Sequence, residues 1–177
     1  VYVEFLNTGI CFSRIGRVYW PFPLPQSIFI GRCAHLIGHI KHEMMHTMGF
    51  YHEHSRSDRD DYINIEWDNI SDGREDQFET YRYRLIKKCY IQIILIAKTV
   101  EDNFPNRYRW TTAFGEGYDY DSIMHYSSKA FSKQPFGDEP MLTITPKNPS
   151  VNFTTLGRKV NLSDTDIIKI KKLYKCP

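Results

Sequence analysis

Two histidines four residues apart, followed by a glycine and a third histidine, place the strongest constraint on this chain. They occur in the segment His42-Glu-Met-Met-His46-Thr-Met-Gly49-Phe-Tyr-His52. Residues four apart share one face of an α-helix, so both imidazoles can reach one metal ion. A glycine can then end the helix in the left-handed conformation, after which the chain can return with the third histidine. The spacing predicts a helix that ends near Gly49 and a metal site with three histidine ligands.

Zinc suits this ligand set. Zn²⁺ binds imidazole nitrogen at about 2.0–2.1 Å, and a site with three protein ligands keeps a fourth position for water. Glu43 directly follows His42 and can reach such a water as a general base. A closed structural zinc site usually has four His or Cys ligands, and a purely structural zinc module remains an alternative. The complete pattern of histidines, glutamate and glycine favours a catalytic site.

Three further histidines lie close to this motif in the sequence. His35 and His39 are also four residues apart, but no carboxylate or later ligand is placed to complete a second site. His54 follows the third ligand of the motif by two residues. We expect all three to be structural or surface residues.

Composition limits the class of protein. The 177 residues suggest one domain. The 23 Lys and Arg residues nearly balance the 21 Asp and Glu residues, which argues against a nucleic-acid partner that needs a basic field. The most apolar run, Ile91–Ala97, is far shorter than the ~20 residues of a membrane span. The chain starts at Val1 without the features of a signal peptide, so we expect such a peptide to be absent or removed.

Two further elements can be predicted from residue patterns at the ends of the chain. Residues 1–6 alternate β-branched and aromatic residues with polar ones, which is typical of a strand. The stretch Leu162–Tyr174 has apolar residues at helical spacing, and Ser163 or Asp164 can cap it. We therefore expect the chain to begin on a strand and to end on a helix.

Longer stretches of the sequence resemble the astacin family of metzincin zinc endopeptidases. The segment His42–Asp60 resembles the family's zinc signature, and Ser122-Ile-Met-His-Tyr126 resembles its Met-turn. The stretches Tyr2–Cys33 and Leu162–Cys176 are also similar to the family. The resemblance implies an α+β, metzincin-type fold with two lobes. A twisted, mostly parallel mixed sheet and the active-site helix would form the upper lobe, and an irregular lower lobe would carry the C-terminal helix.

The same resemblance implies roles for individual residues. The three histidines of the motif would bind zinc, and Glu43 would be the general base. Tyr126 would bind zinc at rest and swing to stabilise the oxyanion, with Met124 beneath the metal. On the residues alone, ordinary core packing is the favoured interpretation of Met124 and Tyr126, because this is what such residues usually do. In the family, the residue that corresponds to Glu53 meets the buried N-terminus, and a local salt bridge is the alternative.

The resemblance also pairs Cys11 with Cys33 in a disulfide, which implies an oxidising, extracellular setting. Cys176 lacks its partner in the family, and a bridge between Cys89 and Cys176 remains possible. The chain contains three Asn-x-Ser/Thr patterns that could be glycosylated, at Asn69, Asn152 and Asn161.

Three departures from the family stand out. The chain starts later than family members do, so we expect residues 1–177 to be one astacin-like peptidase domain without its N-terminal portion and with apolar sheet surface exposed. Residues 85–100 predict an insertion, although a genuine strand or helix packed on the lower lobe is an equal alternative. The prolines within Val18–Phe29 put in doubt the edge strand with which a substrate would pair.

The sequence therefore predicts a secreted, Zn²⁺-dependent metalloendopeptidase whose substrates are proteins or peptides. It would hydrolyse internal peptide bonds with a zinc-bound water that Glu43 activates. The alternative is a zinc-binding but catalytically inactive astacin-like protein or fragment.

Overall fold

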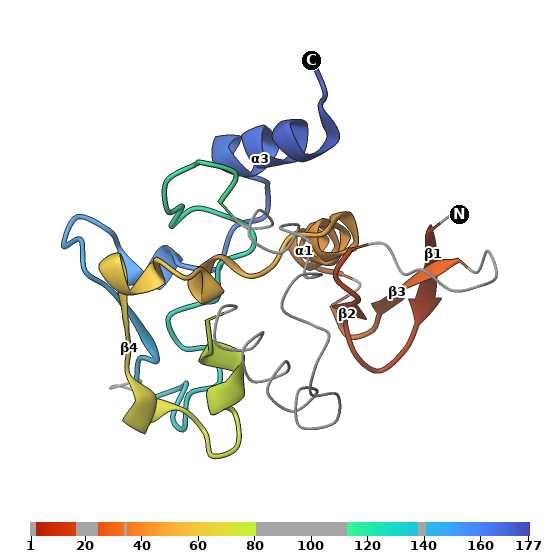
Figure 1. Ribbon diagram of the computed structural model, residues 1–177. Coiled ribbons are helices and arrows are strands. Elements are labelled where there is room, and N and C mark those ends of the chain that lie inside the picture. Colours follow the sequence, from red (N-terminus) through yellow and green to blue (C-terminus); the bar gives the residue numbers. More distant parts are fainter. Residues whose placement is uncertain (1–2, 17–24, 34, 81–112, 138–140) are drawn as a thin grey trace, which may run out of the picture.

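The computed structural model describes residues 3–16, 25–33, 35–80, 113–137 and 141–177 (Figure 1). Cys89 and the predicted insertion at residues 85–100 lie outside these ranges. Within them, no helix is long and apolar enough to cross a membrane. The fold is α+β, with strands β1 (Val3–Asn7), β2 (Phe12–Ser13), β3 (Gln26–Ile30), β4 (Ile63–Ile65) and β5 (Ile144–Pro146), and helices α1 (Ile37–Met48) and α3 (Asp164–Tyr174). Short 3₁₀ helices connect them, at Glu53–Ser55, Arg59–Asp61, Trp67–Asn69, Glu75–Phe78 and Phe153–Thr155.

The upper lobe consists of a three-stranded sheet and α1. The strand order is β1-β3-β2, with β1 parallel and β2 antiparallel to β3, so the described sheet is mixed. α1 packs against β2 and β3. In Figure 1 the three strands lie to one side of α1 and β4 lies to the other. The strand predicted from the alternation of apolar and polar residues at positions 1–6 is therefore confirmed as β1.

The edge of this sheet differs from the interpretation of Val18–Phe29 as the rim. Gln26 to Phe29 belong to β3, which is central and paired on both sides, and residues 17–24 are outside the described ranges. The strand beside the cleft is β2, which comes earlier in the chain. That interpretation was wrong for residues 26–29, because they lie in the central strand β3. The prolines of this segment end at Pro25, so residues 26–29 all keep the backbone N–H that pairing needs.

α1 is the helix that the histidine spacing predicts. It ends at Gly49, which has a φ of 110° and donates its N–H to the His46 carbonyl at 2.9 Å. Only glycine adopts this backbone conformation without a steric cost, which explains the glycine between the second and third histidines. The chain turns sharply there and brings His52 back toward the helix.

The lower lobe is mostly irregular and has its own core. β4 and β5 form a two-stranded antiparallel sheet, and a cluster of buried side chains packs around it, made up of Ile63, Ile70, Phe78, Ile144 and Leu156. A second cluster joins the two lobes beneath α1 and consists of Met45, Phe50, Ile123 and Met124. Ile170 and Leu173 of α3 pack against this second cluster, so the C-terminal helix supports the base of α1.

α3 begins as predicted. The Ser163 side chain accepts a hydrogen bond from the backbone N–H of Asp166, and the Asp166 carboxylate accepts one from the Ser163 N–H. This capping box satisfies backbone donors that a helix N-terminus would otherwise leave unpaired.

The sheet carries exposed apolar side chains, as expected from the resemblance. Phe5 of β1 is 55% exposed and Phe12 of β2 is 45% exposed, and Val3, Leu6 and Ile10 are exposed as well. Apolar side chains gathered on one sheet form a surface that could pack against further protein.

Cys11, directly before β2, and Cys33, shortly after β3, form a disulfide that ties together the ends of these two strands opposite their connection, and Cys176 is exposed. A sequence separation of 22 corresponds to about 3 kcal/mol of stabilisation in the chain-entropy model. We expect the Cys11→Ser, Cys33→Ser double variant to lose about this much free energy of unfolding. Urea unfolding curves of parent and variant test this, with Cys176→Ser as the control. Equal midpoints for parent and double variant would contradict it.

Candidate metal centre

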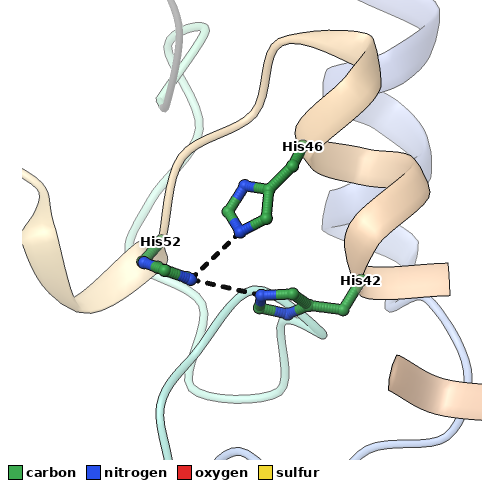
Figure 2. Close-up of side chains that lie close together, drawn as sticks. All are labelled: His42, His46 and His52. Carbon is green, nitrogen blue, oxygen red and sulfur yellow. Dashed lines mark hydrogen bonds between the residues drawn. The ribbon is translucent and has the colours of Figure 1, made fainter. Parts of the chain in front are cut away.

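Three imidazoles converge at the junction of α1 and the segment that follows it (Figure 2). His42 and His46 project from neighbouring turns of α1, and His52 faces them from the returning chain. The Nε2 atom of His52 lies 3.2 Å from Nε2 of His42 and 3.1 Å from Nε2 of His46. Among the described residues, these three histidines are the one group of at least three His, Cys, Asp or Glu side chains whose ligand atoms lie close enough together to hold a metal ion. The structure thus brings together all three histidines of the motif.

Hydrogen bonds fix which nitrogen of each helical histidine carries the proton. Nδ1 of His42 lies 2.8 Å from the carbonyl oxygen of Ile123, and Nδ1 of His46 lies 2.8 Å from that of Phe50. A carbonyl only accepts, so each Nδ1 must donate and each Nε2 carries a lone pair. Burial lowers the pKa of His42, and burial together with the neighbouring His42 ring lowers the pKa of His46 to about 4. Both rings are therefore neutral near pH 7.

This arrangement fits a zinc ion. The Nε2 lone pairs of His42 and His46 both lie close to Nε2 of His52, and a cation between the three nitrogens would be attracted to them. Tetrahedral coordination with Zn–N bonds of about 2.05 Å separates the ligand nitrogens by about 3.3 Å, close to the observed distances. His42, His46 and His52 would hold the ion.

Glu43 lies beside the histidines and is buried. The Ser13 N–H of β2 donates a hydrogen bond to its carboxylate. The other oxygen, Oε2, is a buried polar atom that has no hydrogen-bond partner within the described residues. A buried oxygen without a partner usually marks the place of a water or ligand. Burial raises the pKa of Glu43 to about 7, which suits a general base, and a nearby Zn²⁺ would lower it.

The Met-turn segment lies directly against the third ligand. The Tyr126 ring is 4.4 Å from the His52 ring and 3.9 Å from the His54 ring, measured between centroids. Met124 is buried in the cluster beneath α1, and its carbonyl accepts the Glu53 N–H at 3.0 Å. Tyr126 is therefore in the site, whereas Met124 supports it from below.

His35, His39 and His54 are structural or surface residues, as expected from the sequence. His54 is fully buried, with Nε2 3.2 Å from the carbonyl of Gln77. His35 and His39 are exposed, and His39 lies at the cleft.

A cleft of about 850 Å³ runs between the lobes and contains the three histidines. Residues 11–15, which include β2, line one wall, and Tyr126, Gly157 and Lys159 contribute to the other. β2, an edge strand of the described sheet, therefore borders the three converging histidines directly. An extended peptide in this cleft could pair with β2.

A buried ionic network adjoins the third ligand, and its extent is not apparent from the sequence. The Glu53 carboxylate contacts the Lys169 ammonium at 2.8 Å and the Arg56 guanidinium at 2.9 Å. The local salt bridge considered for Glu53 is therefore present. Burial raises the pKa of Glu53, an effect that the two cations oppose. Asp166 of α3 is also buried and binds the Met-turn segment. The Ser-x-x-Asp pattern of the capping box marks Asp166, but no sequence pattern indicates its second role.

His125 provides a stability prediction that depends on pH. Its Nδ1 lies 2.6 Å from the Tyr126 carbonyl, its Nε2 lies 2.7 Å from the Tyr118 hydroxyl, and burial lowers its pKa from 6.5 to about 4. The unfolded chain binds a proton below pH 6.5, whereas the folded chain does so only near pH 4. We therefore expect this residue to reduce the free energy of unfolding by about 3 kcal/mol between pH 7 and pH 4.

Urea unfolding at pH 7, 6, 5 and 4 in the presence of chelator measures this effect. The His125→Gln variant should show a shallower loss of stability with falling pH than the parent. Parallel curves for the two proteins would contradict the prediction.

Comparison with known proteins agrees with this site. The family model for the astacin peptidases matches residues 1–93 and 84–175. Zinc metalloproteinase nas-6 of Caenorhabditis elegans is 38% identical over 176 residues, which are 99% of this chain and 41% of that protein. Meprin A subunit alpha of Mus musculus is 34% identical over 175 residues, 99% of this chain and 19% of that protein. The chain thus spans less than half the length of these relatives.

A solved structure is also similar. High choriolytic enzyme 1, a hatching enzyme zinc-protease from Oryzias latipes, superposes with a TM-score of 0.66 at 31% identity. The similarity covers 99% of this chain and 69% of that one. With a family match along nearly its whole length, the chain belongs to the astacin family of peptidases.

Proposed function

We propose that this chain is the catalytic part of a secreted zinc metalloendopeptidase that hydrolyses internal peptide bonds. The observation that carries the proposal is the buried Oε2 atom of Glu43, without a hydrogen-bond partner among the described residues, beside three converging histidine nitrogens in one open cleft. Family membership supports it, because the relatives are named as zinc metalloproteinases.

The residues would divide the reaction between them. His42, His46 and His52 would hold Zn²⁺, which would supply a water of lowered pKa and Lewis-acid chemistry at the scissile carbonyl. The substrate would lie extended along β2, with its scissile bond at the histidines. Glu43 would accept a proton from the attacking water at Oε2 and then deliver it to the leaving amine. Proteins or peptides would be the substrates.

Hydrolysis of a denatured protein by the purified chain tests the proposal. We expect activity with Zn²⁺, loss of activity in chelator, and recovery on adding Zn²⁺ back. Mass spectrometry of the products should show cleavage at internal bonds. Activity that persists at metal-free, chelator-treated equilibrium would refute the mechanism.

Tyr126 is proposed to donate its phenolic O–H to the oxyanion. We expect Tyr126→Phe to lower kcat by about 10²–10³, the usual cost of losing one oxyanion donor, with little change in KM. Steady-state kinetics measure both parameters, and Tyr62→Phe is the control because Tyr62 lies outside the residues that line the cleft. A variant with parental kcat would remove Tyr126 from the mechanism.

A zinc-binding protein without catalysis is the second candidate. The exposed apolar side chains of β1 and β2 favour it, because the active enzyme could require further protein packed there. Stoichiometric zinc binding without turnover in a monodisperse preparation would support this candidate. A purely structural role for zinc predicts instead that chelator unfolds the chain, which melting curves would detect.

Secretion is proposed from the Cys11–Cys33 disulfide, which persists in oxidising compartments. Of the three glycosylation patterns, Asn152 and Asn161 are exposed, whereas the Asn69 amide donates to the Leu142 carbonyl at 2.7 Å. Analysis of the natural protein for an oxidised disulfide and for glycans at these asparagines tests the extracellular assignment.

A further inference from the structure

We infer that α3 positions the metal-binding histidines through two buried side chains, Asp166 and Lys169, each of which holds the backbone beside one ligand. The inference rests on the proposed zinc function and assigns these two residues a role in it. Asp166 and Lys169 are three residues apart, so they lie on the same face of α3. Each is about 1% exposed.

Asp166 acts toward His42 through a short relay. Its Oδ1 atom accepts a hydrogen bond from the Ser122 hydroxyl at 2.7 Å, and Ser122 Oγ accepts one from the Met124 N–H at 3.1 Å. The Met124 N–H and the Ile123 carbonyl belong to one peptide group. That carbonyl accepts the Nδ1–H of His42 at 2.8 Å.

This relay orients one peptide plane at both ends. Because its N–H points to Ser122 Oγ, its carbonyl must point the opposite way, toward His42. Oδ2 of Asp166 also accepts the Ile123 N–H at 2.9 Å, which anchors the preceding peptide group. Asp166 thereby determines which His42 nitrogen faces the metal, and hydrogen bonds in such a chain strengthen one another.

Lys169 acts toward His52. Its ammonium lies 2.8 Å and 3.0 Å from the two carboxylate oxygens of Glu53, the residue directly after His52. Glu53 also accepts the Asp119 N–H at 3.1 Å and donates its own N–H to the Met124 carbonyl at 3.0 Å. The third ligand is therefore tied on one side to α3 and on the other to the Met-turn.

Stability alone does not account for these charges. Replacing a buried ion pair by apolar residues of similar volume is often neutral or stabilising, so such a pair is weak evidence of a contribution to stability. Two separate charged residues of α3 reach the neighbourhoods of two separate ligands, His42 and His52. Positioning of the ligand set explains both at once.

The test compares four variants for zinc affinity, measured by competition with a chromophoric chelator. In Asp166→Asn an amide nitrogen replaces one carboxylate oxygen and cannot accept a hydrogen bond, so either the Ile123 N–H or the Ser122 O–H loses its acceptor. Lys169→Met removes the ammonium. We expect each to weaken zinc binding by about 10–100-fold, the usual effect of losing an outer partner of a metal ligand. Asp164→Asn and Lys171→Met make the same charge changes at exposed positions of α3 and should bind zinc like the parent.

A spectroscopic measurement separates positioning from general stability. In the Co²⁺-substituted protein, Asp166→Asn and Lys169→Met should shift the visible absorption bands, whereas the two exposed variants should not. Lys169→Arg should restore much of the zinc affinity, since it keeps a cation beside Glu53. If Asp166→Asn does not fold, Ser122→Ala breaks the same relay and leaves Asp166 in place. Ser122→Ala should also weaken zinc binding and shift the bands.

The possible outcomes separate the proposed zinc function from the positioning role of Asp166 and Lys169. A parent chain that binds no zinc would overturn the proposed function and this inference with it. A parent that binds zinc, with variants of parental affinity and unchanged Co²⁺ spectra, would overturn the inference alone. The inference would also be overturned if the metal-free variants were less stable than the parent but their folded fraction bound zinc with parental affinity.

Discussion

Replacing Glu43 by Gln is expected to lower kcat by about 10²–10⁴ while zinc stays bound. The amide has nearly the same shape as the carboxylate but cannot accept a proton at the Oε2 position. The three histidines that we propose hold zinc are unchanged, so the metal content should be that of the parent. Peptide hydrolysis followed by fluorescence, with zinc measured by atomic absorption on the same samples, tests both parts.

The control for this variant is Glu75→Gln, which makes the same change at an exposed residue outside the cleft. Its kinetics should match those of the parent. The pH profile adds a second criterion. The base must be ionised, so kcat/KM of the parent should rise with pH through the pKa of Glu43, which bound Zn²⁺ places below about 7. A Glu43→Gln variant with parental kcat, or with the same acidic limb, would exclude Glu43 as the base.

Gly157→Ala is expected to lower the free energy of unfolding by about 2–5 kcal/mol. Gly157 has a φ of 62°, and an added Cβ would lie 2.2 Å from the Ser127 nitrogen and 2.4 Å from the Tyr126 carbonyl carbon. Both contacts are with backbone, which cannot move aside as a flexible side chain can. The clash therefore adds to the cost of the left-handed conformation, and relief of it would displace Tyr126 from the cleft.

Gly73→Ala provides a matched control for this substitution. Gly73 has a φ of 76°, but nothing lies within 4 Å of its added Cβ. It should therefore lose only about 1–2 kcal/mol, the cost of the left-handed backbone alone. Urea unfolding of both variants, with kcat measured alongside, separates the two effects. Equal losses in free energy of unfolding for the two variants would show that a Cβ at position 157 does not clash with the backbone of Tyr126 and Ser127.

The features that could be predicted from the sequence are local. The spacing of His42, His46 and Gly49 specifies a helix, its end and two ligands within a few residues, and α1 has this form. The capping pattern of α3 depends on Ser163 and Asp166, three residues apart. Such signals need no knowledge of distant parts of the chain.

The features that could not be predicted depend on distant pairing. β4 and β5 are three residues each. Ile65 of β4 pairs with Ile144 of β5, although the two residues are far apart in the sequence. Strands this short give no periodicity, and nothing local indicates their partner. Similarly, Lys169 lies on a helix rich in charged residues, where a lysine is normally solvated. Only its tertiary contact with Glu53 explains its burial.

The contacts of α3 bear on how the site matures during synthesis. Glu53 and Lys169 are separated by 116 residues, so the ribosome releases the whole histidine motif long before α3 can dock. Contacts of such long range form late in folding. By the positioning inference, a nascent chain would therefore hold its three histidines loosely until α3 emerged. A chain cut short before residue 166 would keep all three histidines and yet, by the same inference, bind zinc only weakly, so α3 makes tight zinc binding depend on synthesis of the whole segment from His42 to Lys169.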